Sequence, residues 1–337
     1  MNFNPNDIGL DNGNIYGLPY NYNESELVIL PVPWDVTVSY SDGTHLAPSR
    51  IREESLQVDL YDLDYGNFWE KGIYFSKVNE ELLELNNQLR PYAKEAIRLL
   101  ENGEVAEHNS TLHHNIEKVN AGCESMVKWV EEQTSKLISQ NKKVLLLGGD
   151  HSTPLGYLRT LAHLYPDFGI LQIDAHCDLR NAYEGFEYSH ASIMYNALKI
   201  KSITSLHQVG IRDFCEDEVI LSQEHDKDIQ IHFDRVLKNK LYEGEHWKEI
   251  CENIVSQLPS HIYISFDIDG LLPALCPNTG TPVAGGMEVD QVFYLFNLLK
   301  KSNKTIIGID LNEVGNDVWD ANVGARVLYR LCGLWLS

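Results

Sequence analysis

Apolar and polar positions along this chain form two kinds of segment. Short runs that are almost wholly apolar are typical of strands buried on both faces, and the longer segments between them carry apolar residues at helical spacing. The predicted strands are 27–30, 143–147, 168–173, 205–210, 228–233, 261–266 and 305–310. The predicted helices are 78–102, 115–140, 154–164, 190–200, 245–257, 288–301 and 321–334, with a further helix start at 48–52.

From residue 143 onward, strands and helices alternate, which is the pattern of a parallel sheet covered by helices. We therefore predict an α/β fold of three layers, α/β/α, with a mostly parallel central sheet. Residues 1–25 are rich in Asn, Asp, Gly and Tyr and are expected to form an extended or poorly ordered N-terminal arm. Residues 26–337 show no internal repeat and no clear linker, so we expect a single domain there.

Carboxylate and imidazole side chains follow three of the apolar runs. They form three clusters: Asp150-His151, Asp174-Ala175-His176-Cys177-Asp178 and Asp267-Ile268-Asp269. In an extended chain, residues two apart point to the same side, so the acids and imidazoles of each cluster would share a face. Ligands of open α/β sheets lie beyond the carboxyl ends of the strands, where all three clusters fall. So many acids would repel one another without a cation, and we predict a site for two divalent metals.

Composition narrows the classes of partner. The formal net charge is −22 and no Lys/Arg cluster occurs, which argues against a nucleic-acid-binding protein. An acidic field favours metal ions and small cationic substrates, although acidity that only keeps the protein soluble explains the charge equally well. The six cysteines are dispersed, with no C-x-x-C pair, as expected for reduced thiols in the cytoplasm. We expect no signal peptide and no membrane span.

The donor types constrain the metal. Carboxylates and imidazoles without cysteine favour Mn²⁺, and Ni²⁺, Fe²⁺, Co²⁺ or Zn²⁺ remain open. Two such ions roughly 3.5–4 Å apart could share and activate one water molecule. Each cluster alone could be a turn or a helix cap with a satisfied histidine. Their joint occurrence at three strand ends is what favours a metal site.

Together, the three clusters and the segments around them resemble the motifs of the ureohydrolase superfamily, whose members include arginase and agmatinase. The resemblance spans about residues 25–335 and includes the loop from Pro33-Trp34-Asp35 to Arg52. It is carried by Gly148-Gly149-Asp150-His151-Ser152, Asp174-Ala175-His176-Cys177-Asp178, Ser265-Phe266-Asp267-Ile268-Asp269, Thr279-Gly280-Thr281-Pro282-Val283-Ala284-Gly285-Gly286 and Asp310-Leu311-Asn312-Glu313-Val314. It implies an arginase-like fold, a catalytic domain over 26–337, and homotrimers or homohexamers.

The resemblance also implies two Mn²⁺ ions and their ligands. One ion would be held by His151, Asp174, Asp178 and Asp267, and the other by Asp174, His176, Asp267 and Asp269. A hydroxide shared by the two ions would attack a guanidinium carbon, and the products would be urea and an amine.

Further residues are assigned by the same resemblance. Glu313 would pair with the substrate guanidinium through two parallel N–H bonds. His190 would lie near the mouth of the site and pass protons to the leaving amine. Asp178 would act with these two in catalysis. Apart from the resemblance, the position of Asp150 after two glycines and beside a ligand suggests that it either orients that ligand or stabilises its own turn. Trp319 would stack on the guanidinium or else pack under the last helix. His113 and His114 are expected at the surface.

The substrate is suggested by the segment that ends in Tyr188-Ser189-His190-Ala191-Ser192. It lacks the Ser-Gly-Asn-x-His-Gly of arginase and is similar to agmatinase, which implies hydrolysis of agmatine to putrescine and urea, a reaction of polyamine metabolism. Glu184 and Glu187 would add negative charge at the entrance and suit a cationic tail, unless they point to water. Departures at Leu272, Asn278 and 315–320 leave guanidine, guanidinobutyrate, guanidinopropionate, arginine and formimidoylglutamate open as substrates, and a catalytically silent relative is a further alternative.

Overall fold

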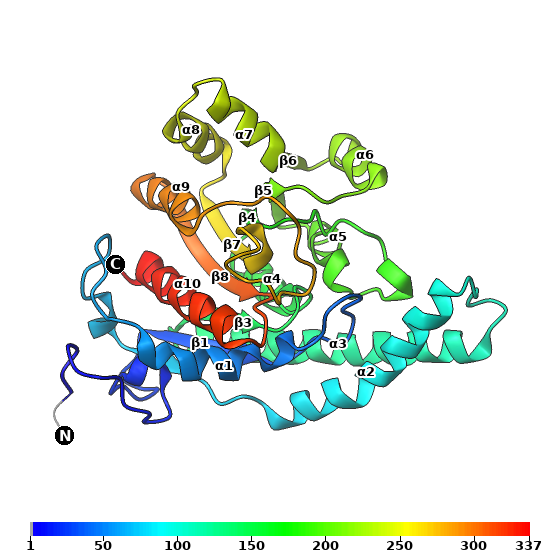
Figure 1. Cartoon of the computed structure of the whole chain (residues 1–337), viewed down its shortest axis with the longest axis horizontal. Helices are drawn as coiled ribbons and strands as arrows, with labels where there is room; N and C mark the ends of the chain where they lie inside the picture. The colour runs from blue at the N-terminus through cyan, green and yellow to red at the C-terminus, as the bar shows by residue number, and fades with distance from the viewer. Residues whose placement is uncertain (1–2) are drawn as a thin grey trace.

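A computed structural model describes residues 3–337 and contains one sheet of eight parallel strands (Figure 1). The strands lie in the order β2-β1-β3-β8-β7-β4-β5-β6. Their bounds are β1 Leu27–Val32, β2 Ile73–Phe75, β3 Lys143–Gly148, β4 Phe168–Ile173, β5 Ile203–Ile211, β6 Asp228–Phe233, β7 His261–Asp267 and β8 Thr305–Asn312. The predicted parallel α/β architecture is confirmed, and the sequence analysis missed only the short edge strand β2.

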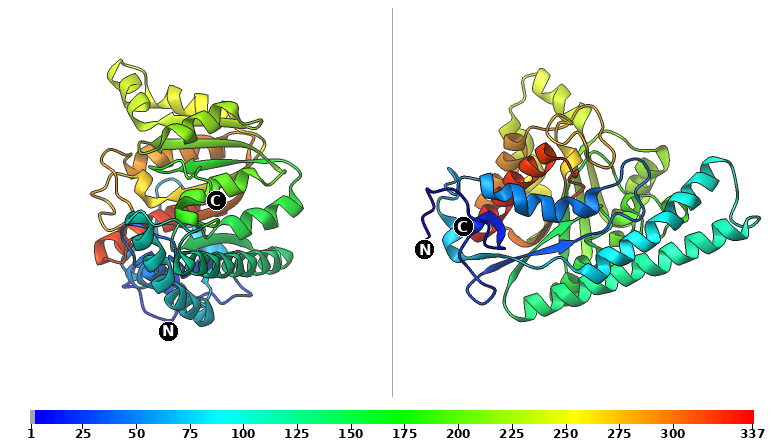
Figure 2. Two further views of the ribbon diagram at one scale, coloured as in Figure 1. Left: turned by 90° about the vertical axis from the view of Figure 1, so that its right-hand side faces the viewer. Right: turned by 60° about the horizontal axis from the view of Figure 1, so that its bottom comes forward.

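Helices cover both faces of this sheet (Figure 2). One face carries the helices α2 to α5, and the other carries α1 and α8 to α10. The helices are α1 Ala47–Glu54, α2 Glu80–Glu101, α3 Ser110–Ser139, α4 Leu155–Leu164, α5 Ile193–Leu198, α6 Glu216–Glu224, α7 Asp234–Tyr242, α8 Trp247–Gln257, α9 Val289–Lys301 and α10 Val318–Leu336. The result is the three-layer arrangement expected from the sequence.

Two apolar cores result from this layering, one on each face of the sheet. The strand β3 shows how one strand contributes to both of them. Leu145 and Leu147 of β3 pack into one core, whereas Val144 and Leu146 pack into the other. All four are fully buried, as alternation along a strand covered on both sides requires. The loops at the carboxyl edge of the sheet are therefore anchored by strands that are buried on both faces.

The N-terminal segment differs from the extended arm that was expected. Residues 14–18 are buried, and Ile15 and Leu18 are fully enclosed in the apolar core. Asn14 donates to the carbonyl oxygen of Ile73 at 2.9 Å, and the Tyr16 hydroxyl donates to that of Ala325 at 3.1 Å. Residues 14–18 therefore link the edge strand β2 to the last helix through these two hydrogen bonds and the buried side chains of Ile15 and Leu18.

Other boundaries were predicted less well. The segment 190–200 is a 3-10 turn, His190–Ser192, followed by the short helix α5. The helix α10 begins at Val318 rather than 321, and α6 and α7 were not predicted at all. In α6 only Glu218 is buried, and the helix has no apolar face. Its sequence therefore lacks the periodic apolar positions from which a helix is predicted.

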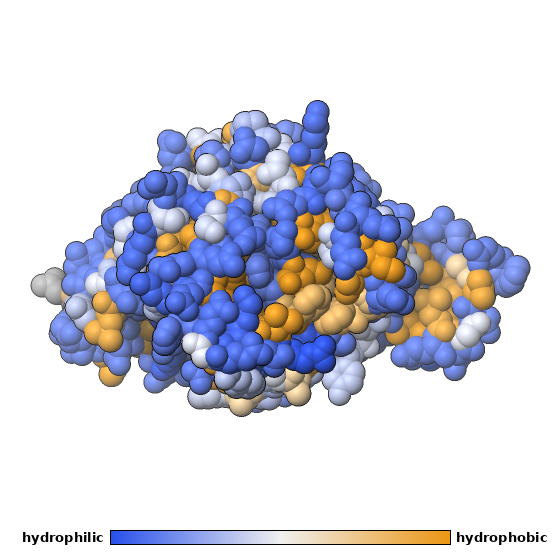
Figure 3. Space-filling view, turned by 90° about the horizontal axis from the view of Figure 1, so that it is seen from above, coloured by the Kyte–Doolittle hydropathy of each residue, from blue (hydrophilic) through white to orange (hydrophobic). Residues whose placement is uncertain are grey.

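The helices α2 and α3 form a long antiparallel hairpin that projects from the body of the molecule (Figure 2). Seen from above, most of the surface is hydrophilic, and hydrophobic side chains show on the hairpin and near the middle of this face (Figure 3). Within residues 3–337, none of the helices combines the length and apolarity needed to cross a membrane.

Candidate metal centre and active site

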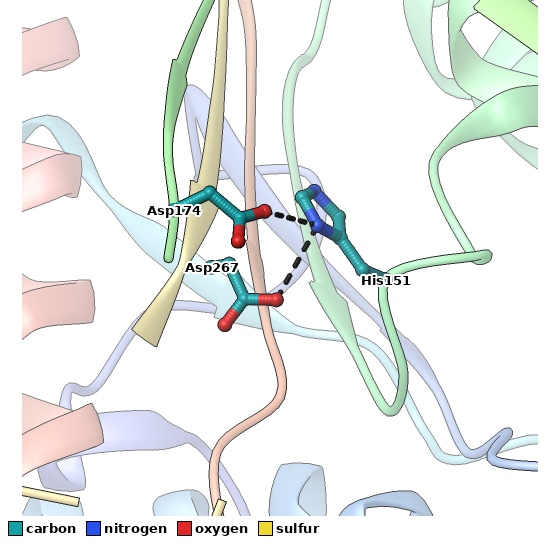
Figure 4. A group of neighbouring side chains, drawn as sticks. All are labelled: His151, Asp174 and Asp267. Carbon is teal, nitrogen blue, oxygen red and sulfur yellow. Dashed lines mark ion pairs between the residues drawn. The ribbon is translucent and has the colours of Figure 1, made fainter. Parts of the chain in front are cut away.

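The carboxyl ends of three strands bring the predicted acids and imidazoles together. Asp174 directly follows β4, Asp267 ends β7, and His151 lies just beyond β3 (Figure 4). The His151 Nδ1 atom is 3.0 Å from Asp174 Oδ2, 3.3 Å from Asp267 Oδ2 and 3.0 Å from Asp178 Oδ2. One imidazole nitrogen thus faces three carboxylate oxygens, all contributed by buried side chains.

A second group shares Asp174 with the first. His176 Nδ1 lies 3.6 Å from Asp174 Oδ1 and 3.0 Å from Asp269 Oδ2. The ligand-type atoms of Asp174, His176 and Asp269 lie within 4.8 Å of one another, as do those of His151, Asp174 and Asp267. The predicted cluster of two neighbouring groups of metal-ligand type is therefore present in the structure.

Backbone amides hold the carboxylates of this cluster in place. Each of three acids accepts one backbone N–H on Oδ1, which leaves Oδ2 turned toward an imidazole. The donors are His176 N to Asp174 at 2.6 Å, Ala175 N to Asp269 at 3.0 Å and Asp269 N to Asp267 at 2.8 Å. Oxygen atoms fixed in this way are preorganised for an ion rather than free to rotate away.

The electrostatics of the cluster fit a bound cation. His151 Nδ1 is buried and makes no hydrogen bond within the described chain, although three carboxylate oxygens surround it. Burial raises the pKa of Asp267 well above its ordinary value, and the charges of Asp269 and Asp174 add to this effect. Burial and the Asp174 charge raise the pKa of Asp178 to about 7. A divalent cation would relieve this repulsion and satisfy the orphaned nitrogen, so the donor set suits the metal pair that was predicted.

A relay of side chains orients the His151 ring from behind. Its Nε2 atom is 2.8 Å from the Ser265 hydroxyl, and that hydroxyl donates to Asp310 Oδ1 at 3.2 Å. Such contacts fix the tautomer and direction of a ligating imidazole. The sequence analysis gave neither Ser265 nor Asp310 this role, because a polar residue inside a strand shows no pattern of its own.

Glu313 lies beside the cluster with one oxygen engaged and one free. Its Oε1 atom accepts the His151 backbone N–H at 2.9 Å, whereas Oε2 is buried and has no partner among residues 3–337. Its φ of 61° is left-handed, a strained backbone conformation that is common at functional sites. A Cβ atom at Gly280 would lie 2.7 Å from Oε2, so glycine keeps the space before this oxygen open.

His190 is held at the opposite side of the cavity by Thr37. The His190 backbone N–H donates to Thr37 Oγ1 at 3.2 Å, and the same oxygen is 3.5 Å from the ring Nδ1. Burial, and then the charge of His176, lower the pKa of His190 to about 3. The imidazole is therefore uncharged at neutral pH.

These residues border one cavity of about 360 Å³, a size usual for small-molecule sites. The sequence analysis identified His151, His176, Asp178, His190, Asp267 and Glu313 among its lining. It gave no role in the site to the other lining residues, which are Ser39, Tyr40, Arg180, Tyr183, Ala191, Asp213, Phe214, Glu218, Thr281, Pro282 and Val283. Ala191 and the segment 281–283 lie in motifs quoted for the resemblance, but a motif match alone does not show which of its side chains border a cavity.

The residues predicted to stack on the substrate or to add charge at the entrance do not line the cavity. Trp319 borders a separate hollow with Leu275 and Arg326, donates its indole N–H to the carbonyl oxygen of Ala274 at 3.0 Å, and is half exposed rather than packed under the last helix. The loop acids Glu184 and Glu187 do not line the cavity. Burial, followed by the charge of Glu101 on α2, raises the pKa of Glu184 to about 7, because the chain turns this side chain toward the α2–α3 hairpin.

Asp150 makes the contacts expected of a residue that stabilises its own turn, and His113 and His114 lie at the surface, as expected. Asp150 accepts from the Ser152 backbone N–H at 2.9 Å, which stabilises the turn around His151, and its other oxygen is 3.5 Å from the Thr37 hydroxyl. His113 lies at the surface with its side chain 61% exposed, and His114 is also exposed.

Two of the three sequence departures noted near the pocket, Asn278 and the segment 315–320, are linked to each other by contacts. Asn278 donates its backbone N–H to Asp320 Oδ2 at 2.9 Å, and Gly315 N–H points to Cys276 Sγ at 3.5 Å. A Cβ atom at Gly315 would clash with the Asp320 carboxylate, so glycine is required at this point. Leu272 lies apart from these contacts, with its N–H bonded to the carbonyl oxygen of Met287 at 3.0 Å.

Comparisons with known proteins agree with this geometry. The model of the arginase family matches residues 25–333. An agmatinase of Halalkalibacterium halodurans is 27% identical over 87% of this chain and 85% of its own. An N(1)-aminopropylagmatine ureohydrolase of Thermus thermophilus is 29% identical over 94% of both chains. The solved structure of a Trypanosoma cruzi formiminoglutamase with Mn²⁺ shares the fold, with a TM-score of 0.69 at 14% identity over 96% of this chain and 97% of that one.

Proposed function

The chain belongs to the arginase family, and we propose that it is a metal-dependent amidinohydrolase that cleaves a guanidino compound to urea and an amine. The observation that carries this proposal is the pairing of a cluster of metal-ligand type with a free carboxylate oxygen. Glu313 Oε2 is buried and unpartnered within residues 3–337, and Glu313 lines the cavity in front of the cluster. A planar guanidinium is a cation able to satisfy such an oxygen.

For the metal centre we propose two Mn²⁺ ions, with other divalent transition metals as alternatives. One ion would be held by His151, Asp174, Asp178 and Asp267, and the other by Asp174, His176, Asp267 and Asp269. When bound, such ions supply Lewis acidity and make water a stronger nucleophile at neutral pH. The T. cruzi relative is described with Mn²⁺, which supports this choice of metal.

Glu313 would bind the substrate and set the direction of attack. Its side chain is fixed by the His151 N–H, so the free oxygen can accept only from a ligand in the cavity. The resulting ion pair would hold the guanidinium carbon beside the cluster, and burial strengthens it because little water competes. Glu313 is thus a positioning and charge-stabilising group, and it does not itself supply the nucleophile.

His190 would handle the proton that hydrolysis must move. The reaction adds water across a C–N bond, so the leaving nitrogen needs one proton from that water to depart as an amine. The uncharged imidazole can accept this proton and release it to the leaving nitrogen. Thr37 would keep the ring in place during both transfers.

As substrate we favour agmatine, which would give putrescine and place the enzyme in polyamine metabolism. The agmatinase relatives and the Tyr-Ser-His-Ala-Ser segment support this choice. A second candidate is N(1)-aminopropylagmatine, because relatives of that name cover 93–94% of this chain and the cavity has room beyond the guanidinium. We also propose a homotrimer or homohexamer in the cytoplasm; the six free cysteines, five of them buried, support that compartment.

Urea release from a panel of guanidino compounds tests this function. The purified protein, loaded with Mn²⁺, is expected to release urea from agmatine or its aminopropyl derivative faster than from guanidine, arginine or guanidinobutyrate. Absence of urea from every compound, with metal confirmed in the protein, would overturn the proposal in favour of a silent relative.

The ligand assignment has its own test. Asp269→Ala should lose most of one metal equivalent and reduce activity by at least about a thousandfold while the chain stays folded, because the remaining ligands leave one ion under-coordinated. Asp226→Ala, which removes an exposed acid whose side chain is 92% accessible, is the matched control and should retain both metal and activity. Metal analysis and circular dichroism accompany the rates, and full turnover by Asp269→Ala would refute the assignment.

A further inference from the structure

We propose that Asp213, at the mouth of the cavity, binds the ammonium group of the substrate tail and thereby selects guanidino compounds with cationic tails. This inference rests on the proposed function and adds the group that distinguishes one substrate from another. Asp213 follows β5, its backbone N–H donates to the carbonyl oxygen of Ala175 at 3.0 Å, and its side chain is 69% exposed. It therefore lies on the rim, next to the His176 end of the cluster.

Of the two acids at the mouth, Asp213 is the one whose carboxylate has no ion pair with Lys or Arg within residues 3–337. The other rim acid, Glu218, is buried, accepts the backbone N–H groups of Leu179 and Cys215, and lies 3.4 Å from Arg180 Nε. Asp213 makes no hydrogen bond through its carboxylate in the described chain, and the nearest cationic type of group is His176 Nε2 at 4.0 Å. A ligand ammonium would thus find one free negative charge there.

The two arginines near the mouth do not neutralise Asp213. Arg180 is paired with Glu218, and its guanidinium lies over the Tyr183 ring at 5.4 Å. Arg212 donates to the carbonyl oxygens of Asp269 at 2.6 Å and of Val283 at 3.0 Å, which pins the opposite wall of the cavity. Neither arginine forms an ion pair with Asp213 within residues 3–337, so the Asp213 carboxylate would repel a carboxylate tail and attract an ammonium tail.

Aromatic side chains complete the surroundings that a cationic alkyl tail would need. Phe214 and Tyr40 border the same cavity and are 41% and 80% exposed. Phe214 is braced by Phe233, with ring centroids 4.7 Å apart. Methylene groups pack on such rings, and an ammonium near their faces gains cation–π attraction. The mouth therefore has the chemistry to bind an aminoalkyl chain along its length.

The test compares three tails on the same guanidinium: agmatine, the uncharged isostere pentylguanidine, and 4-guanidinobutyrate. For Asp213→Asn we expect KM for agmatine to rise about tenfold with kcat within about twofold, and kcat/KM for pentylguanidine to stay within about twofold. Asp213→Lys should reverse the preference, raising the guanidinobutyrate-to-agmatine ratio of kcat/KM about a hundredfold. Asp217→Asn, an exposed acid outside the cavity, is the matched control and should change none of these values.

Two results would overturn the inference. If Asp213→Asn lowers turnover of all three compounds equally, Asp213 acts through His176 rather than on the tail. If no kinetic value changes for any of the three compounds, it does neither. Calorimetric titration with agmatine measures the same contrast without turnover. Absence of urea release together with weaker agmatine binding by Asp213→Asn would reject the proposed function and retain the tail site.

Discussion

Buried histidines occupy two regions of this sheet, and the groups that face them differ. At the carboxyl edge, His151 is surrounded by three carboxylates within 3.3 Å. Between β5 and β6, His207 is fully buried and stacks on His232 with ring centroids 5.9 Å apart. No hydrogen bond to either His207 nitrogen occurs within residues 3–337, and the nearest carboxylate oxygen, of Asp228, is 3.9 Å away.

The difference shows how neighbours decide the charge of the same side chain. Burial alone would lower the pKa of His151, but the three carboxylates close to its Nδ1 atom raise that pKa well above its ordinary value. Burial lowers the pKa of His207, and burial together with the His207 charge lowers that of His232 to about 4. The first region has an excess of negative charge that calls for cations, whereas the second excludes charge and contributes packing.

Glu313→Gln tests the excess charge at the first region and should have the largest effect of the three changes considered next. The amide keeps the size of the side chain but loses the charge that pairs with a guanidinium. We expect kcat/KM for agmatine to fall by a factor of about 100 to 1,000, as truncating a buried charge pair usually costs about 2–5 kcal/mol. Steady-state kinetics measure the loss, and unchanged metal content shows that the cluster itself is intact. A loss below fivefold would contradict the role of Glu313.

Removal of the metals tests whether cations hold the first region together. At metal concentrations about a hundredfold above Kd, binding adds about 2.7 kcal/mol to the free energy of unfolding, and a chelator should remove it and lower Tm. Hydrogen exchange should increase in 148–153, 174–178 and 267–270. The same measurement on 203–211 and 228–233 is the internal control, because the His207–His232 region has no counter-ion to lose. Equal increases in both regions would contradict the distinction.

Acid pH tests the second region, and its effect is the smallest. Since the pKa of His232 is about 4 in the folded protein and 6.5 in the unfolded chain, its contribution is complete above pH 6.5 and is lost as pH falls toward 4. Between pH 7 and 5.5 this loss is about 1 kcal/mol. His232→Phe keeps a ring against His207 without this titration, so urea denaturation should show that much less acid sensitivity. Identical pH dependence of the two proteins would reject the assignment.

How much of the molecule could be predicted depended on whether a residue belonged to a pattern. The strands were predictable because runs such as 143–147 are apolar throughout, which only burial on both faces explains. The cluster was predictable because its acids recur at strand ends. By contrast, Asp213 and Phe214 are single residues on a loop, and their place at the mouth follows from the path of β5 rather than from local spacing.

Two further differences have physical causes of the same kind. Tertiary packing overrides local composition at residues 14–18, where Ile15 and Leu18 are buried although the surrounding sequence is polar. Trp319 was expected at the substrate because it lies near Glu313 in sequence. The turn at 315–317 and the start of α10 carry it to the rim of another hollow, so closeness in sequence did not become closeness in space.

The strand order has a consequence for how the protein is made. The last strand to leave the ribosome, β8, lies between β3 and β7 in the middle of the sheet. Until it arrives, β3 and β7, the strands that lead to His151 and to Asp267, have no common neighbour, so the group of ligands around His151 stays open. The group around Asp269 needs only β4 and β7, which pair directly. The two halves of the ligand cluster are therefore completed at different stages of synthesis, and the His151 half comes last.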